Sequence, residues 1–132
     1  MTDSVTRMLA ADAASRALGI VVHDVAPGAA TATMTIREDM VNGHGITHGA
    51  FVFAVADTAF ACACNSHGRP TVAAAADITF VAPSHAGDVL EARAVERARF
   101  GRSGIYDVTV RRGEDVIAEF RGTSRTIGND PT

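Results

Sequence analysis

The sequence contains no tryptophan, one tyrosine and only two cysteines in 132 residues. Aromatic side chains make up 5% of it, although 47% of the residues are hydrophobic, so alanine supplies much of the apolar content. Small side chains let packed elements approach closely, and a chain of this size buries more apolar surface when it oligomerises. The length predicts a single domain over residues 1–132 and leaves no room for two independent cores.

Long uncharged apolar runs are also missing. The first 20 residues carry Asp3, Arg7, Asp12 and Arg16, so they lack the apolar centre of a signal peptide. The most apolar stretch, 50–64, is interrupted by Asp57 and is shorter than the roughly 20 residues that cross a bilayer. We therefore expect a soluble, cytoplasmic protein with no membrane partner.

Charge and cysteine content favour neither a nucleic-acid partner nor a metal. The chain has 12 basic and 15 acidic residues and a net charge of -3, without the excess of positive charge that binds polyanions. Cys62 and Cys64 lie two apart in a predicted helix and do not face each other, which predicts buried free thiols. His44 and His48 have metal-like spacing, but Gly45 disfavours a helix there and no ligand set is complete. We expect no metal and no cofactor.

Hydrophobic periodicity predicts an ordered series of elements. An amphipathic helix over 6–18 ends before Gly19, and strands over 20–25 and 30–36 form a hairpin around Pro27-Gly28. After a loop, Thr47 is the predicted N-cap of a helix over 48–64. Four strands in meander order follow, over 72–81, 89–99, 104–112 and 116–127. An antiparallel sheet wrapped around the central helix would bury that helix on all sides.

Asp57 is the main catalytic candidate. Its neighbours from Phe53 to Ala61 are apolar apart from Thr58, and no Lys or Arg lies within a helical turn. A carboxylate in such surroundings loses solvation, which raises its pKa and makes it a stronger base. Two structural alternatives stay open, because Asp57-Thr58 could begin a separate helix or lie on a solvent-facing stripe.

The glycine-rich segment 42–49 supplies a second chemical group. The first N–H groups of a helix have no intrahelical acceptor, so the Gly49 N–H is a candidate donor to a thioester oxygen that gains negative charge. Gly49 and Asp57 are eight residues apart, or about 12 Å along one helix. They cannot act on one carbonyl from the same helix, so a two-fold partner must supply one of them.

Several other side chains have two readings each. His48, at the helix start, either positions substrate or holds the loop. Arginines at 97, 99, 102, 111 and 112 either form ordinary solvated charge or a phosphate cradle at one end of the later strands. Four phenylalanines, at 51, 53, 80 and 100, could each line a ligand pocket or belong to the core. His23, His67 and His85 are expected at the surface.

The motifs resemble a known family. Asn42-Gly43-His44, His48-Gly49 and the run FAVADTAFACACNS over 53–66 closely resemble the PaaI-type thioesterases of phenylacetate degradation. GRSGIYDV over 101–108 and FRGTSRTIG over 120–128 do so too, and the resemblance extends from about residue 15 to 128. It implies the hotdog fold, an α+β fold in which an antiparallel β-sheet wraps around a central α-helix. It also implies hydrolysis of (hydroxy)phenylacetyl-CoA or similar aryl or medium-chain acyl-CoA by a tetramer built as a dimer of dimers.

The resemblance assigns roles to individual residues. Asp57 matches the catalytic acid, as general base or nucleophile, and Gly49 matches the oxyanion-binding N–H. Asn42 matches the side chain that positions water or carboxylate, and His48 matches the histidine of the family's H-G-G pattern. Ala50 departs from that pattern, which has a second glycine there.

Further assignments concern the ends of the substrate. Some related aryl-CoA thioesterases have a helper hydroxyl one turn after the catalytic acid; the residue there in this sequence is Ala61, so that hydroxyl is absent. Arg99 and Arg102 are the candidate contacts for the phosphates of CoA. A non-catalytic acyl-CoA binding or sensing module on the same fold is the alternative, although it would leave Asp57 as an unexplained buried charge. A hotdog hydratase would need a His–acid motif that the sequence lacks.

Overall fold

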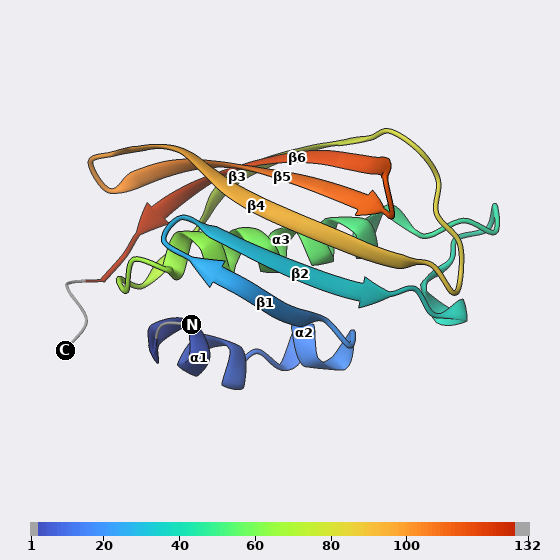
Figure 1. Ribbon diagram of the computed structural model, residues 1–132, viewed down its shortest axis with the longest axis horizontal. Coiled ribbons are helices and arrows are strands. Elements are labelled where there is room, and N and C mark those ends of the chain that lie inside the picture. The colour runs from blue at the N-terminus through green and yellow to red at the C-terminus, as the bar shows by residue number, and fades with distance from the viewer. Residues whose placement is uncertain (1–2, 129–132) are drawn as a thin grey trace.

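The computed structural model describes residues 3–128. Its centre is helix α3 (Gly49–Asn65), and one six-stranded antiparallel sheet curves around it (Figure 1). Two short helices, α1 (Asp3–Ala10) and α2 (Ala13–Ala17), contact α3 where the sheet leaves it uncovered. The predicted arrangement of a sheet around a central helix is therefore confirmed.

The strands occupy nearly the predicted ranges: β1 (Val21–Ala26), β2 (Ala29–Thr35), β3 (Thr71–Phe80), β4 (Val89–Phe100), β5 (Ser103–Arg112) and β6 (Asp115–Thr126). A 3-10 turn (Glu38–Met40) lies in the loop before α3. The strand order is β1-β2-β4-β5-β6-β3, so the prediction that the last four strands form a meander is wrong for β3. Because α3 carries the chain across the concave face, β3 forms at the far edge, and β4 returns to pair with β2.

Alternation along the strands builds the core. Tyr106, Val108 and Val110 are buried, as predicted, while the residues between them face outward. Small side chains on β2 and β4, at Ala32 and Ala92 among others, are fully buried and let the sheet approach α3 closely. The core therefore depends on close approach of backbones more than on large aromatic side chains.

The N-terminal helix is divided, which the periodicity did not predict. Asp12 accepts hydrogen bonds from the Ser15 N–H at 2.9 Å and from the Ser15 hydroxyl at 2.6 Å, and so caps a new helix, α2. The Ser15 hydroxyl also lies 2.9 Å from the Thr58 hydroxyl in the core. The cap thus begins α2 at the point where the N-terminal segment contacts α3.

Strand β3 is an unusual edge of the sheet. It pairs with β6 alone, and its residues from Val72 to Asp77 are exposed on both faces although four of them are alanine. Phe80 and Val81 at its end are 54% and 56% exposed. An apolar strand with an unpaired hydrogen-bonding edge is a surface that another chain can cover.

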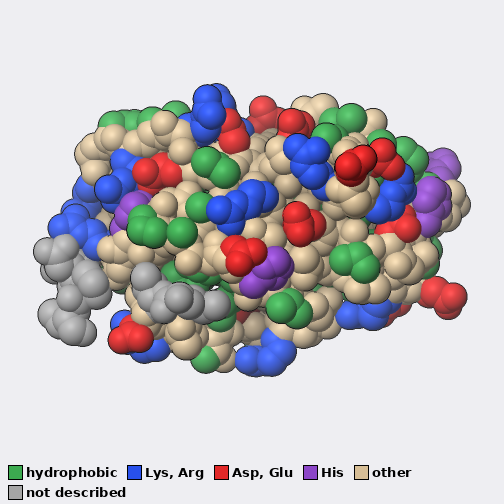
Figure 2. All heavy atoms as spheres, viewed as in Figure 1, with side chains coloured by type: hydrophobic (Ala, Val, Ile, Leu, Met, Phe, Trp, Pro, Cys, Tyr) green, Lys and Arg blue, Asp and Glu red, His purple; other side chains and the backbone are tan. Residues whose placement is uncertain are grey.

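The two cysteines are free and buried, as predicted. Burial raises the pKa of both Cys62 and Cys64 to about 12, so neither thiol forms the thiolate that nucleophilic attack requires at neutral pH. Among the described residues, no helix combines the length and the apolar character needed to cross a bilayer. Acidic and basic side chains intersperse on the face that Figure 2 shows.

Candidate active site

Helix α3 begins with a side-chain cap, but the residue is His48 and not the predicted Thr47. The His48 Nδ1 accepts a hydrogen bond from the Ala50 N–H at 3.1 Å, so the proton of the neutral ring lies on Nε2. Thr47 is buried, and its hydroxyl accepts a 2.7 Å hydrogen bond from Ser84. Its side chain is therefore engaged in holding the loop before β4 against the start of α3.

Gly49 is the first residue of α3. Within residues 3–128, its N–H has no acceptor, which is the expected state of a first-turn donor. The ring of Phe80 lies against Gly49 where a side chain would otherwise project: a β-carbon built on Gly49 would be 2.8 Å from the Phe80 Cζ. Glycine at this position thus allows an aromatic ring to lie beside an unpaired donor.

Asn42 organises the loop before α3. Its Oδ1 accepts hydrogen bonds from the backbone N–H groups of His44 at 2.8 Å and Ile46 at 3.3 Å. The Asn42 N–H donates to the Ile46 carbonyl at 2.8 Å, which closes the turn. These contacts use the side-chain oxygen, so the group that Asn42 has left to offer a ligand is its amide NH2.

Asn42, Gly49 and Phe80 line one cavity of about 470 Å³. Its remaining walls are mostly apolar and come from the loop, the first turn of α3 and the segment after β3: Ile46, Thr47, Val52, Val81, Ala82, Pro83 and Ser84. The structure thus brings together two of the predicted site residues. His48 is exposed beside the cavity, with its ring 6.3 Å from that of Phe51.

Asp57 lies in the middle of the continuous helix α3, which excludes the alternative that it caps a separate helix. It is half-buried between Ala54 and Ala61, one turn away on either side. Burial raises the pKa of its carboxyl, and the negative charge of Asp12 raises it further. Within the described part of the chain, the carboxylate has no hydrogen-bond or ion-pair partner. Eight residues of helix, about 12 Å, separate it from Gly49 of the same subunit.

Arg99 and Arg102 lie at the opposite end of α3 from Gly49. They line a second hollow, of about 380 Å³, with His67, which lies just beyond the end of the helix. The Arg102 Nε donates to the Thr126 carbonyl at 3.1 Å, while the Arg99 Nε lies 3.5 Å from the Glu96 Oε1. The Asp57 side chain therefore lies between the Gly49 cavity and this basic hollow along the helix axis.

The other three arginines of the predicted cluster, at 97, 111 and 112, do not line this hollow. Arg97 faces outward and pairs with Asp107 at 3.3 Å. Arg111 and Arg112 lie at the far end of β5, roughly 30 Å away at about 3.4 Å per residue, where Arg112 pairs with Asp88. The expectation of one basic cluster is wrong for Arg111 and Arg112, because the ten residues of β5 carry the chain to the opposite end of the sheet.

His67, which was predicted at the surface, is partly buried and belongs to a polar cluster. Its Nε2 lies 2.8 Å from the Glu96 Oε1, which also accepts a 2.8 Å hydrogen bond from the Tyr106 hydroxyl. Burial opposes ionisation of Glu96, but the hydrogen bonds from His67 and Tyr106 outweigh it and hold the pKa of Glu96 below its usual value. No local pattern signals this cluster, because its members are far apart in sequence.

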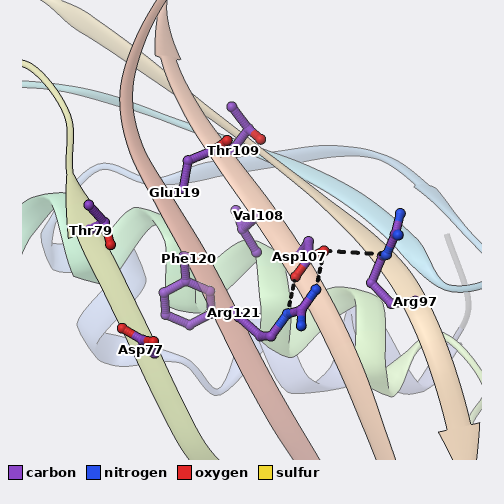
Figure 3. A pocket seen from close by; sticks show the side chains of 9 residues that line it. All are labelled: Asp77, Thr79, Arg97, Asp107, Val108, Thr109, Glu119, Phe120 and Arg121. Carbon is purple, nitrogen blue, oxygen red and sulfur yellow. Dashed lines mark hydrogen bonds and ion pairs between the residues drawn. The ribbon is translucent and has the colours of Figure 1, made fainter.

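A third hollow, of about 550 Å³, lies on the outer face of the sheet (Figure 3). Asp107 accepts two hydrogen bonds from Arg121, at 2.6 and 2.9 Å, and Arg97 approaches it from β4. Asp77 and Glu119 lie on neighbouring strands of the same face (Figure 3). This hollow contains none of the predicted catalytic residues, and the sheet separates it from α3.

Comparison with known families agrees with this arrangement. The model of the thioesterase superfamily matches residues 44–119, which include the end of the loop before α3, α3 itself and most of the sheet. The chain belongs to the thioesterase superfamily. This thioesterase is 44% identical over 122 residues to the acyl-coenzyme A thioesterase PaaI of Escherichia coli, covering 92% of this chain and 87% of the relative.

Solved structures extend the likeness. The Escherichia coli PaaI protein from the phenylacetic acid degradation operon has a TM-score of 0.93 and 42% identity, covering 98% of this thioesterase and 94% of that chain. A mutant of the phenylacetic acid degradation protein PaaI from Thermus thermophilus has a TM-score of 0.83 and 39% identity, covering 86% and 97%. The predicted hotdog fold and the PaaI-type resemblance are thereby confirmed.

The structure also separates the four phenylalanines that the sequence left as alternatives. In this thioesterase Phe51 packs against His48, and Phe53 contacts Phe120 with ring centroids 5.3 Å apart. Phe100 lines the basic hollow at the other end of α3. Phe80 is therefore the one whose ring lines the cavity at Gly49.

Proposed function

We propose that this thioesterase hydrolyses acyl-CoA esters, with a preference for phenylacetyl-CoA and similar aryl or medium-chain esters, to the free acid and CoA. The observation that carries the proposal is the cavity at the start of α3, where an unpaired Gly49 N–H and the Asn42 amide line otherwise apolar walls. A cavity of this kind suits an apolar acyl group whose carbonyl needs a donor. The name of the Escherichia coli relative, an acyl-coenzyme A thioesterase, supports the same class.

The site is complete only in a dimer. Asp57 and Gly49 lie about 12 Å apart on one helix, so a two-fold partner places Gly49 of one subunit beside Asp57 of the other. Two surfaces support such a dimer: the half-exposed stripe of α3 around Asp57, and the apolar, unpaired edge of β3. Both surfaces have the small side chains that close packing of a second copy requires.

Asp57 performs the central chemical step. Its carboxylate takes a proton from a water molecule that attacks the thioester carbonyl, or attacks the carbonyl itself to form an anhydride that water then hydrolyses. In both routes the C–S bond breaks, and CoA leaves as a thiolate that takes up a proton to give the free thiol. In both routes the carbonyl oxygen gains negative charge, which the Gly49 N–H and the positive end of the α3 dipole stabilise. The raised pKa of Asp57 makes it a stronger proton acceptor than an exposed aspartate.

Asn42 and His48 complete this end of the site. The amide NH2 of Asn42 holds the attacking water or the Asp57 carboxylate of the partner. His48 has a structural function, because its Nδ1 caps α3 and orients the first turn that contains Gly49. Single turnover in heavy-oxygen water can identify the anhydride route, since label enters the Asp57 carboxyl only when water attacks the Asp57 side of an anhydride.

Arg99 and Arg102 are the proposed contacts for the CoA phosphates. They lie beyond the end of α3, about 12 Å or more from Asp57 at the rise of a helix. The extended pantetheine arm of CoA separates its thiol from its phosphates, so a substrate held at Asp57 has its nucleotide end in this direction. Guanidinium groups bind phosphate through paired hydrogen bonds.

The assembly that we infer is a tetramer, built as a dimer of dimers. We take the outer face of the sheet, where Arg97 and Arg121 pair with Asp107 (Figure 3), as its second contact surface. We place the enzyme in the cytoplasm, because acyl-CoA esters are made and consumed there.

Asp57→Asn and Asp57→Ala test the proposal, with release of CoA thiol as the measurement. Loss of the base should lower kcat by about 10²- to 10⁴-fold, while circular dichroism and the oligomeric state stay unchanged. Asp24→Asn is the matched control, because Asp24 has a 74% exposed side chain on the edge strand β1 and lines neither the Gly49 cavity nor the basic hollow. Unchanged turnover in Asp57→Asn would remove Asp57 from the mechanism. Tight binding of acyl-CoA by the wild type without thiol release would instead identify a binding module.

A further inference from the structure

Phe80 occupies a fixed position at the end of β3. Its backbone pairs with Ala118 on β6, and the next two N–H groups, of Val81 and Ala82, both donate to the Ile117 carbonyl at 2.8 and 3.2 Å. The segment that carries the ring is therefore held by the sheet on one side. A side chain on such a segment loses little conformational freedom when it binds a ligand.

The ring lies directly on Gly49. A β-carbon on Gly49 would be 2.8 Å from the Phe80 Cζ and 3.3 and 3.4 Å from its two Cε atoms, so this contact exists only because residue 49 is glycine. The acyl cavity thus has an aromatic wall immediately beside the N–H that the mechanism uses. The Phe80 side chain is nevertheless 54% exposed in the single subunit, so Gly49 covers only part of the ring.

Phe80 differs from four of the other five phenylalanines in its ring contacts; only Phe100, which lines the basic hollow at the other end of α3, also has none within the described residues. Phe53, Phe60 and Phe120 pack against one another or against Tyr106, and Phe51 contacts His48. In residues 3–128, Phe80 has no such ring partner and is the sole aromatic residue lining the cavity. The other walls that this subunit contributes are aliphatic or polar, so Phe80 is the aromatic contact that the subunit offers to a ligand ring.

We propose that Phe80 is the specificity-determining residue of the acyl cavity, and that its ring selects flat aryl acyl groups over straight-chain ones. The inference rests on the proposed function and names what that site distinguishes. Offset and edge-to-face ring pairs are favourable beyond the burial of apolar area, which amounts to roughly a two- to tenfold gain in affinity for an aryl group. A straight acyl chain buries apolar area against Phe80 in the same way but forms no ring–ring interaction with it.

Phe80→Leu is the decisive variant, because leucine keeps an apolar side chain of similar bulk without the ring. We expect KM for phenylacetyl-CoA to rise roughly two- to tenfold, KM for hexanoyl-CoA to change by less than about twofold, and kcat to stay within about twofold for both. Val21→Ala, at a 60% exposed apolar position on the other edge of the sheet, should leave both KM values unchanged. Equal changes of KM for the two esters in Phe80→Leu would overturn the inference.

Binding of thioether analogues separates this inference from the proposed function. Wild type and Phe80→Leu are titrated calorimetrically with S-phenethyl-CoA and S-hexyl-CoA, which cannot be hydrolysed. A loss of affinity in Phe80→Leu for the phenethyl compound alone supports the role of Phe80, whether or not turnover is observed. An equal loss of affinity for both compounds, or no loss for either, refutes it. Wild-type protein that hydrolyses no thioester refutes the function alone. Dissociation of Phe80→Leu into smaller species would identify the ring as a subunit contact and also overturn the inference.

Discussion

Asp57 is the one charged residue of α3. Its half-buried position strengthens the carboxylate as a base and also lowers the stability of the folded protein. Burial removes water from the carboxylate and raises its pKa, and Asp12 adds repulsion. The same desolvation that strengthens the base makes the charged form unfavourable in the folded protein. Residues kept in such surroundings are typical of functional sites.

The stability of Asp57→Asn should therefore depend on pH in a defined direction. Because the folded-state pKa of Asp57 lies above the unfolded value, the penalty for the charged form is fully present above the folded pKa and absent below the unfolded one. Asp57→Asn should unfold at a higher temperature than the wild type at neutral pH, and the difference should shrink as the pH falls through the folded pKa. Thermal unfolding across a pH series measures this. A variant that is less stable at neutral pH would contradict it.

Gly49 can be tested through the N–H alone. Proline is tolerated at the first position of a helix, and His48 has the extended backbone, with ψ 134, that a residue before proline needs. Gly49→Pro removes the donor, while Gly49→Ala adds a similar β-carbon against Phe80 and keeps the donor. We expect kcat of Gly49→Pro to be lower than that of Gly49→Ala by about 10²- to 10³-fold. Equal values of kcat for the two variants would show that this N–H does not stabilise the oxyanion.

Among the elements, β6 lies close to α3 because residue 122 has no side chain. A β-carbon on Gly122 would meet the Phe60 ring at 2.7 Å, and that ring is buried against Tyr106 and Phe120. Gly122→Ala should lower the free energy of unfolding by about 1–3 kcal/mol through overpacking, measured by urea denaturation. Gly43→Ala is the control, because a β-carbon added there would have no atom within 4 Å. Equal urea midpoints for the two variants would show that α3 and β6 move apart to accept the added β-carbon without loss of stability.

The elements themselves were predictable where a local pattern specifies them. The α3 boundary was within one residue at each end, because an apolar run between a glycine-rich loop and Gly68 has few alternatives. The N-terminal helix was predicted as one segment, because the Asp12 cap matters only once Ser15 reaches Thr58. Similarly, Thr47 was predicted to cap α3, but its hydroxyl accepts a hydrogen bond from Ser84, which is distant in sequence.

At the scale of the whole molecule, the proposed site belongs to two subunits, which mixed dimers can test. Asp57→Ala and Gly49→Pro are each inactive in the proposed mechanism, but a dimer of one with the other contains one site with both wild-type groups. Random mixing of equal amounts, after denaturation and refolding together, should restore about one quarter of wild-type activity. Separately refolded samples that are combined without exchange are the control. Failure to restore activity in verified mixed dimers would mean that each subunit uses its own residues.

The sequence by itself determined the central helix with its single acid, the alternating strands around it, and the motif that identifies the superfamily. These features depend on neighbours within a few residues, so periodicity and residue type are sufficient to predict them. Only the tertiary structure decided that β3 pairs with β6, that Glu96 joins His67 to Tyr106, and that Phe80 covers Gly49. Such contacts join residues far apart in the chain, and they depend on which sheet edge remains open and which backbone lacks a side chain.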